Sequence, residues 1–172
     1  MKKISFLLLC IMALSFNNGF SQKCKVGADP ITNEKVASFD FSSRTVFYEY
    51  KSGVIHLEMK FTYSGSYKVI VPRETEMIFK LENGEIIKLA TISDAPPKTR
   101  ATATQYSAYI NTDYSYLVEL TKDQVTKLAT SKVILIRYPD TQGGSLDYTP
   151  KGLGKIYTNV LFKGANCIRE NF

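Results

Sequence analysis

The sequence predicts an α+β fold, in which a single domain is built on an antiparallel β-sheet accompanied by two helices. Residues 54–63 alternate without a fault between apolar and polar side chains, which is the period of a strand with one buried face. Asn83-Gly84 separates two apolar runs, as in a tight β-hairpin. Toward the C-terminus apolar residues recur at steps of three and four, the period of an amphipathic helix.

The first expected hairpin joins residues 45–51 to the alternating segment 54–63. Residues 45–51 are rich in Val, Phe and Tyr, which favour strands, and a short turn at 51–53 separates the two segments. A further strand is expected at 67–71, because the β-forming residues there end at Pro72.

Residues 77–89 carry the clearest local signal. A two-residue turn at Asn83-Gly84 places Leu81 opposite Ile86. Both faces of this hairpin then carry apolar side chains, so we expect it deep in a sheet and not at an edge.

The middle of the chain is expected to be a loop followed by two strands. Pro96-Pro97 interrupts any helix or ladder, which makes residues 93–100 a loop. Strand character returns over residues 102–120, and a bend near 111–113 is expected to divide it in two.

Two helices complete the expected fold. Thr121 and Gln124 form a capping box at the start of a short helix near 122–130. An apolar strand follows at 132–138, and a Thr-Pro pair then opens a C-terminal helix near 151–169. The pattern leaves open whether the sheet forms a sandwich, is curved, or is covered by the helices.

The chain begins with a segment typical of exported proteins. Lys2 and Lys3 precede an uncharged apolar run at 4–16, and small residues follow it. The run is too short for a membrane-spanning helix, so we interpret residues 1–22 as a secretory signal peptide. We expect one globular domain at 23–172, exported to the periplasm or the extracellular space, with no transmembrane segment in the mature chain.

The composition indicates an ordinary globular domain. The sequence is 44% apolar and 22% charged, and about 150 residues suffice for one core. Without the two leader lysines the formal net charge falls from +6 to +4. This surplus is scattered and the chain is exported, so we expect no nucleic-acid partner and at most a weak attraction to anionic glycans or envelope surfaces.

Two cysteines remain after the leader and its Cys10 are removed. Cys24 and Cys167 lie at opposite ends of the mature domain, in a compartment that permits disulfides. We expect them to be bridged; the alternative is a pair of buried free thiols. Their spacing resembles neither a zinc site nor a redox pair.

His56 is the only histidine of the chain, and it falls on the polar side of the alternating strand beside Glu58. We therefore interpret it as an ordinary surface residue. The sequence contains no nucleophile elbow, nucleotide-binding fingerprint or zinc ligand set. The acidic loop at 140–147 lacks the EF-hand spacing. We expect no catalytic residue, no metal site and no cofactor.

Tyrosine is the one compositional oddity, with eleven copies and no tryptophan. Tyrosines on an exposed sheet face, with cations nearby, can stack on sugars or contact a protein partner. The alternative is that they fill the core or its rim. The candidate ligand-binding residues are four clustered tyrosines and two neighbouring cations: Tyr106, Tyr109, Tyr114, Tyr116, Lys98 and Arg100.

The leader ending in Phe-Ser-Gln and the short element Asp29–Lys35 resemble those of uncharacterised small secreted β-rich proteins of Bacteroidetes-type bacteria. The resemblance implies an exported β-rich domain and no particular activity.

Two functions are consistent with the sequence. The first is an exported non-enzymatic binding or envelope-associated module, which would use a sheet face or the loops at 93–100 and 139–148 to contact a glycan or a secreted or envelope protein. The alternative is a hydrolase of glycans or peptides that works through carboxylates, whose spacing is set in space and not in sequence.

Overall fold

The computed structural model describes residues 23–42, 44–103, 108–141, 143–148 and 155–172. The predicted signal peptide at 1–22 lies outside these residues and stays a prediction. The described helices are α2 (Lys122–Thr130) and α3 (Lys155–Arg169). The described strands are β1 (Lys23–Ala28), β2 (Lys35–Phe41), β3 (Val46–Lys51), β4 (Val54–Ser64), β5 (Glu76–Leu81), β6 (Ile86–Ala90), β7 (Lys98–Ala103), β8 (Ala108–Leu120), β9 (Val133–Pro139) and β10 (Ser145–Tyr148).

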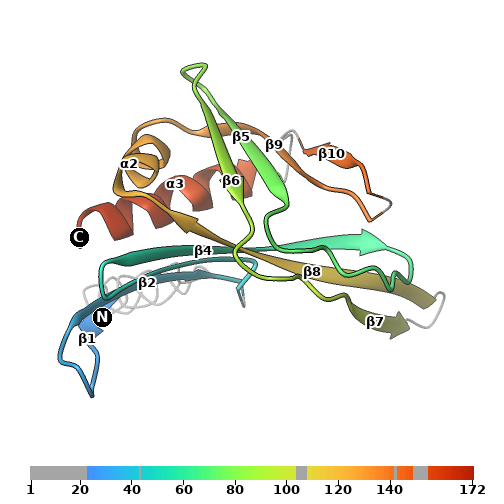
Figure 1. The fold of residues 1–172 in the computed structure, drawn as a ribbon, viewed down its shortest axis with the longest axis horizontal. Coiled ribbons are helices and arrows are strands. Elements are labelled where there is room, and N and C mark those ends of the chain that lie inside the picture. Colours follow the sequence, from blue (N-terminus) through green and yellow to red (C-terminus); the bar gives the residue numbers. More distant parts are fainter. Residues whose placement is uncertain (1–22, 43, 104–107, 142, 149–154) are drawn as a thin grey trace, which may run out of the picture.

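The strands form two antiparallel sheets. The larger has six strands in the order β1-β2-β3-β4-β8-β7, and the smaller has four in the order β10-β9-β5-β6. Figure 1 shows both helices and the smaller sheet on the same side of the six-stranded sheet. We call the side that they cover the inner face and the opposite side the outer face. The predicted α+β fold on antiparallel sheet is confirmed.

The alternation of the sequence places the core. The odd-numbered residues of β4 from Ile55 to Tyr63 are buried, while its even-numbered residues are half-buried or exposed. Neighbouring strands continue the pattern, since Leu57 lies between Tyr48 of β3 and Val118 of β8. The buried apolar side chains of the described residues form one cluster between the inner face and the layer above it.

The first predicted hairpin is confirmed as β3–β4. Lys51 pairs with Val54, and the two residues between them, Ser52 and Gly53, have φ values of 51° and 82°. Positive φ at both positions suits a two-residue hairpin turn that follows the right-handed twist of the strands.

The second hairpin forms, but the predicted register is wrong by one residue. Ile86 pairs with Lys80 and not with Leu81, because the Leu81 amide donates to the Glu85 carbonyl (2.8 Å) and closes a three-residue loop. Gly84 takes the left-handed conformation there, with φ 88°. The slip exposes Ile86 (59%). The expectation that the hairpin lies deep in a sheet is wrong for β6, which is an edge strand.

The bend predicted near 111–113 is absent, and β8 is one strand of thirteen residues. Its odd-numbered polar residues, Asn111, Asp113, Ser115 and Glu119, fit the strand period because they point to the outer face. There the Asp113 carboxylate accepts a hydrogen bond from the Thr62 hydroxyl (2.6 Å). A polar residue on the solvent side of a half-buried strand is expected, and it need not signal a turn.

The strand predicted at 67–71 is also absent, apart from one bridge between Val71 and Ala95. Side chains of β8 bond the backbone of this segment as it crosses the inner face. The Tyr67 amide donates to the Thr112 hydroxyl (3.1 Å), and the Tyr114 hydroxyl donates to the Val69 carbonyl (2.8 Å).

Strands β1, β2, β7 and β10 were not predicted. β7 occupies part of the predicted loop at 93–100, so the loop ends before Lys98. The described side chains of β1, β7 and β10 are almost all exposed. Edge strands of this kind carry little hydrophobic alternation, which is the pattern from which strands were predicted.

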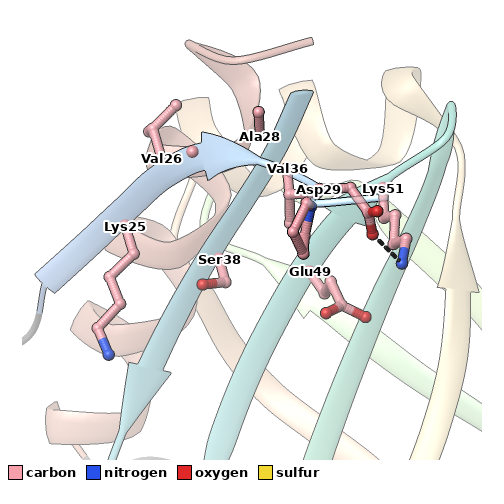
Figure 2. Close-up of a pocket in the computed structure, with 10 residues that line it drawn as sticks. Lys25, Val26, Ala28, Asp29, Val36, Ser38, Glu49 and Lys51 are labelled. Carbon is pink, nitrogen blue, oxygen red and sulfur yellow. Dashed lines mark ion pairs between the residues drawn. The ribbon is translucent and has the colours of Figure 1, made fainter. Parts of the chain in front are cut away.

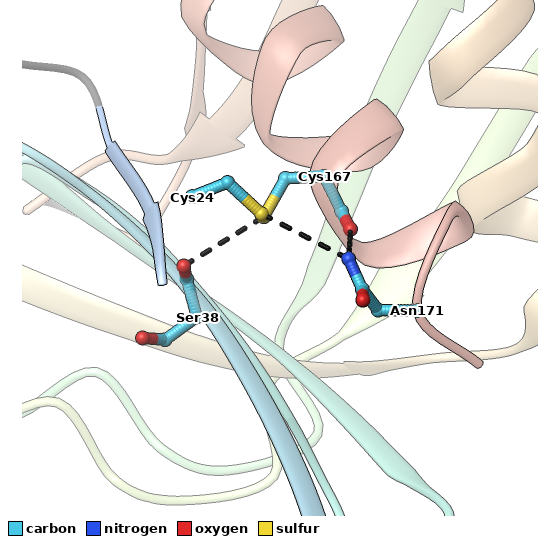
Figure 3. The surroundings of a disulfide bond; sticks show 4 residues. All are labelled: Cys24, Ser38, Cys167 and Asn171. Carbon is cyan, nitrogen blue, oxygen red and sulfur yellow. Dashed lines mark hydrogen bonds between the residues drawn. A yellow bond between two sulfur atoms is a disulfide. The ribbon is translucent and has the colours of Figure 1, made fainter. Parts of the chain in front are cut away.

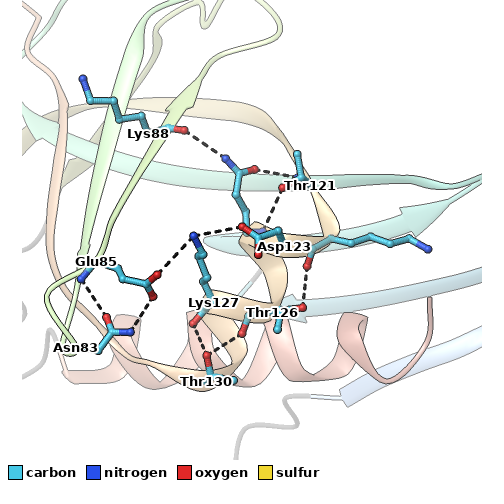
Figure 4. A network of polar contacts seen from close by, with 10 residues as sticks. Asn83, Glu85, Lys88, Thr121, Asp123, Thr126, Lys127 and Thr130 are labelled. Carbon is cyan, nitrogen blue, oxygen red and sulfur yellow. Dashed lines mark hydrogen bonds and ion pairs between the residues drawn. The ribbon is translucent and has the colours of Figure 1, made fainter.

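Helix α2 begins at the predicted capping box and is pinned to the β5–β6 hairpin (Figure 4). The Gln124 amide donates to the Thr121 hydroxyl, and the Thr121 amide donates to the Gln124 side chain. Gln124 also donates to the Lys88 carbonyl (3.4 Å), and Lys127 lies 3.5 Å from the Glu85 carboxylate. These contacts hold the smaller sheet beside the helices.

Helix α3 packs on the inner face over β2 and β3. Its description starts at Lys155, so the predicted start at 151 lies outside the described residues. Tyr48 is fully buried beneath it and donates to the Leu161 carbonyl (3.2 Å). Gly164 permits this close approach, because a Cβ there would lie 2.4 Å from the ring of Tyr48 and 2.9 Å from that of Phe39. Gly164 is thus a packing requirement as well as a weak helix former.

The predicted disulfide between Cys24 and Cys167 is confirmed. It joins β1 to the last turn of α3 across 143 residues of sequence (Figure 3). The Asn171 side chain donates to the Cys167 carbonyl (2.6 Å) beside the bridge. Because β1 is otherwise attached only to β2 in the sheet, the bridge fastens the outermost strand to the covering layer.

Gly164→Ala should lower the free energy of unfolding by about 1–3 kcal/mol, because the new methyl group overpacks the space against Tyr48. The matched control is Lys163→Ala on the exposed side of the same helix turn, which should change stability by less than about 0.5 kcal/mol. Urea unfolding followed by circular dichroism measures both. A stabilised Gly164→Ala variant would contradict the close packing of α3 on Tyr48.

The double variant Cys24→Ser/Cys167→Ser should lose about 2–5 kcal/mol of stability, since the unfolded chain regains the freedom of a loop of this length. Reduced wild-type protein serves as the control and should unfold at the same urea concentration as the variant. Equal stability of the oxidised wild type and the double variant would argue against a cross-link between β1 and α3.

Candidate functional site

The described covering elements leave the outer face of the six-stranded sheet open. Both helices and the smaller sheet lie on the inner side (Figure 1). The outer face carries charged and polar side chains from all six strands, which cross-strand register arranges in rows. An antiparallel sheet with one packed face commonly exposes the other to solvent, so this face is where we look for a functional site.

His56 lies in a cross-strand row with Ser38, Glu49 and Glu119. It lies on the outer face, as predicted, but is half-buried and not fully exposed. Its cross-strand neighbours are Glu49 on β3 and Glu119 on β8. No hydrogen bond or ion pair joins His56 to another described residue. The sequence analysis missed these two neighbours, although a two-residue turn at 52–53 already places Glu49 opposite His56.

A shallow groove of about 390 Å³ lies at the β1–β3 end of the sheet (Figure 2). The carboxylate of Asp29 sits in its wall with 12% of the side chain exposed, 2.6 Å from Lys51 Nζ. It also accepts hydrogen bonds from the amides of Ile31 (2.9 Å) and Thr32 (3.0 Å). The hydrogen bond from Lys51, followed by the backbone bonds, holds the pKa of Asp29 well below its usual value. Asp29 therefore fixes the β1–β2 turn and has no proton to transfer.

The β7–β8 hairpin brings three of the predicted ligand-binding residues onto the outer face. Lys98 and Arg100 are two residues apart on β7, and Tyr109 pairs with Thr102 in the adjacent strand. Tyr109 is 55% exposed. Arg100 lies 3.1 Å from Asp113, whereas Lys98 forms no ion pair within the described part of the chain. We call Lys98, Arg100, Thr102 and Tyr109 the hairpin patch.

The prediction that Tyr114 and Tyr116 belong to an exposed binding surface is wrong, because both are 0% exposed. Successive residues of a strand point to opposite faces, so these even-numbered tyrosines face inward while Tyr109 faces outward. The alternative interpretation, in which they fill the core, is the one observed. Tyr106 lies outside the described residues.

The inward tyrosines join the two sheets. Tyr63 donates a hydrogen bond to the Pro139 carbonyl (2.6 Å), and its hydroxyl lies 2.9 Å from that of Tyr116. Since the Tyr63 proton is used by Pro139, Tyr116 is the donor of the second bond. The rings of Phe61 and Tyr138 stack above them at 4.2 Å. Burial raises the pKa of Tyr116 to about 12 and that of Tyr63 further.

The acidic loop considered for calcium holds a structural ion pair. Arg137 donates two hydrogen bonds to Asp147, at 2.6 and 2.7 Å. This pairing lowers the pKa of Asp147. Among the described residues, no group of three His, Cys, Asp or Glu side chains is arranged to hold a metal ion.

The sequence matches no protein-family model, and neither a curated protein nor a solved structure matches it significantly. Within the described ranges, the helices are too short or too polar to cross a membrane.

The buried phenols should make the protein sensitive to alkali. Tyr48, Tyr63 and Tyr116 have raised pKa values in the fold, so their contribution to stability is complete below the unfolded value of about 10 and is lost as the pH rises above it. Absorbance at 295 nm should show tyrosines that stay neutral at about pH 11 until guanidinium is added. Tyr116→Phe should remove one of them and cost about 1 kcal/mol. Ionisation of all eleven tyrosines in one step in the native protein would contradict their burial.

Proposed function

We propose that this protein is an exported, non-enzymatic binding module that contacts its partner through the hairpin patch on the outer sheet face. One observation carries the proposal: two cations and an exposed tyrosine from adjacent strands share an uncovered face at the end of the sheet. Arg and Tyr are the residue types that most often dominate protein interfaces.

The charge of the hairpin patch indicates the chemistry of the partner. Arg100 forms an ion pair with Asp113. Lys98 lies opposite the same carboxylate in the register but forms no ion pair within the described residues, so the patch keeps a surplus of positive charge. An acidic surface of a secreted or envelope protein would supply the missing charge. None of the described pockets is lined by residues of the patch, which favours a protein surface over a sugar chain that needs a groove.

Export is compatible with two features of the fold. The Cys24–Cys167 bridge persists in oxidising compartments outside the cytosol. The leader at the start of the sequence has the charge and length of a secretory signal. Together they support a periplasmic or extracellular location.

A hydrolase remains the second candidate, because Glu49 and Glu119 flank His56 on one face. A carboxylic acid that donates a proton near neutral pH needs a raised pKa. The carboxylates with displaced pKa values, Asp29 and Asp147, are displaced downward. If the enzyme hypothesis is right, Glu49→Gln/Glu119→Gln should abolish turnover of a fluorogenic glycoside or peptide panel without loss of folding.

The binding proposal is tested with the mature chain on arrays of secreted-protein peptides and of glycans. Lys98→Glu/Arg100→Glu should weaken binding to acidic peptides by at least about tenfold, because two attractive charges become repulsive. The control Lys80→Glu/Lys163→Glu has the same net charge but changes exposed lysines away from the outer face, and it should bind like the wild type. An equal loss of binding in both variants would show that the hairpin patch is not the binding surface. Binding to glycans alone would show that the partner is a glycan and not a protein.

A further inference from the structure

We propose that strand β7 accepts an extended acidic segment of a partner protein as a seventh strand of the large sheet. This inference rests on the proposed binding function and names how the partner is held. In β-strand addition, backbone hydrogen bonds supply affinity and alternate side chains supply specificity.

Strand β7 is an edge that is open on both faces. All six of its residues are exposed, and it pairs with β8 through six consecutive residue pairs without a bulge. Among the described strands, β8 is its one neighbour. Every second backbone N–H and C=O group of β7 therefore points away from β8, toward the position of another strand.

The other edge strands of the described sheets differ from β7. β1 is fastened to α3 by the Cys24–Cys167 bridge. β10 has only four residues, and β6 has five and lies above β8. Proteins protect edges with prolines, bulges, short strands, covering elements or charge. Of these devices, β7 carries only charge, in Lys98 and Arg100.

These two cations select against a second copy of the chain. Antiparallel pairing of two β7 edges would bring Lys98 and Arg100 of each copy close to those of the other, and like charges opposite one another destabilise a sheet. A partner strand with Asp or Glu at alternate positions would instead place negative charges beside Lys98 and Arg100, and this attraction would stabilise the pairing. The same residues thus oppose self-association and favour an acidic partner.

The residues of β7 on the inner side of the sheet indicate which side chains the partner needs at its remaining, alternate positions. Its residues there are Thr99, Ala101 and Ala103, which are small and exposed. Ala101 pairs with Ile110 of β8, which is 50% exposed. Apolar side chains of an added strand would pack beside Ala101 and Ala103 on this side of the sheet. The partner segment therefore alternates acidic and apolar residues over about six positions.

The test uses the mature protein and an acetylated, amidated octapeptide in which Glu and Val alternate. A matched peptide carries N-methyl groups on alternate amides, which removes the backbone donors but keeps the charge. We expect the first peptide to bind and to protect every second β7 amide from hydrogen exchange, measured by NMR. The methylated peptide should bind at least about tenfold more weakly.

Charge reversal supplies the reciprocal arm. Lys98→Glu/Arg100→Glu should lose the Glu-Val peptide and gain a Lys-Val peptide of the same length. Circular dichroism of the variant checks that the sheet is intact. Equal binding of the methylated peptide would overturn strand addition while leaving the charged patch as the binding surface.

Two further outcomes overturn the inference. If the Glu-Val peptide does not bind at millimolar concentration, strand addition at β7 is wrong. The proposed binding function would still stand if acidic peptides on the arrays bind in a way that depends on Lys98 and Arg100. Protection of β7 amides in the protein alone, together with dimers in sedimentation, would assign the edge to a second copy.

Discussion

The apolar side chains of the six-stranded sheet point to its inner face. The described covering elements therefore pack on that side. Helix α3 lies over β2 and β3, and the smaller sheet meets β4 and β8 through the tyrosines around Tyr63. This one-sided burial has a direct consequence for the outer face. None of the described elements covers it, so its side chains are mostly polar or charged and face solvent.

Close backbone approach and covalent attachment keep the covering layer in place. Gly164 brings α3 down on Tyr48, and the disulfide fixes the end of that helix to β1. On the other side, α2 is tied to the β5–β6 hairpin by Gln124 and Lys127. The two sheets and two helices are thus connected independently of the apolar contacts between them, which gives the outer face a rigid support.

The sequence predicted those parts of the fold whose residues repeat with a period. The alternation of 54–63, the capping box at Thr121 and the disulfide partners all follow from local pattern or chemistry. Strands β1 and β7 could not be predicted in this way, because edge strands bury almost nothing and their pairing depends on a neighbour distant in sequence. The hairpin at Asn83 failed for a subtler reason, since one extra loop residue reverses which side chains face inward.

The residues of the candidate site also divide into those that a local pattern could place and those that it could not. Lys98, Arg100 and Tyr109 share a face of the β7–β8 hairpin, although Lys98 and Arg100 were predicted to lie in a loop. Placing Tyr114 and Tyr116 required only the correct parity along one unbroken strand. A bend assumed near Asp113 concealed that parity. The neighbours of His56 are set by the pairing of three strands. The short β3–β4 turn places Glu49 opposite His56 and could be read from the sequence. Glu119 comes from β8, which is distant in sequence, so its position could not. The disulfide also orders the assembly of the molecule in time. Cys24 is synthesised 143 residues ahead of Cys167, so the thiol of the first strand has no native partner until the last helix has been made, and any earlier oxidation would trap the chain with a foreign thiol.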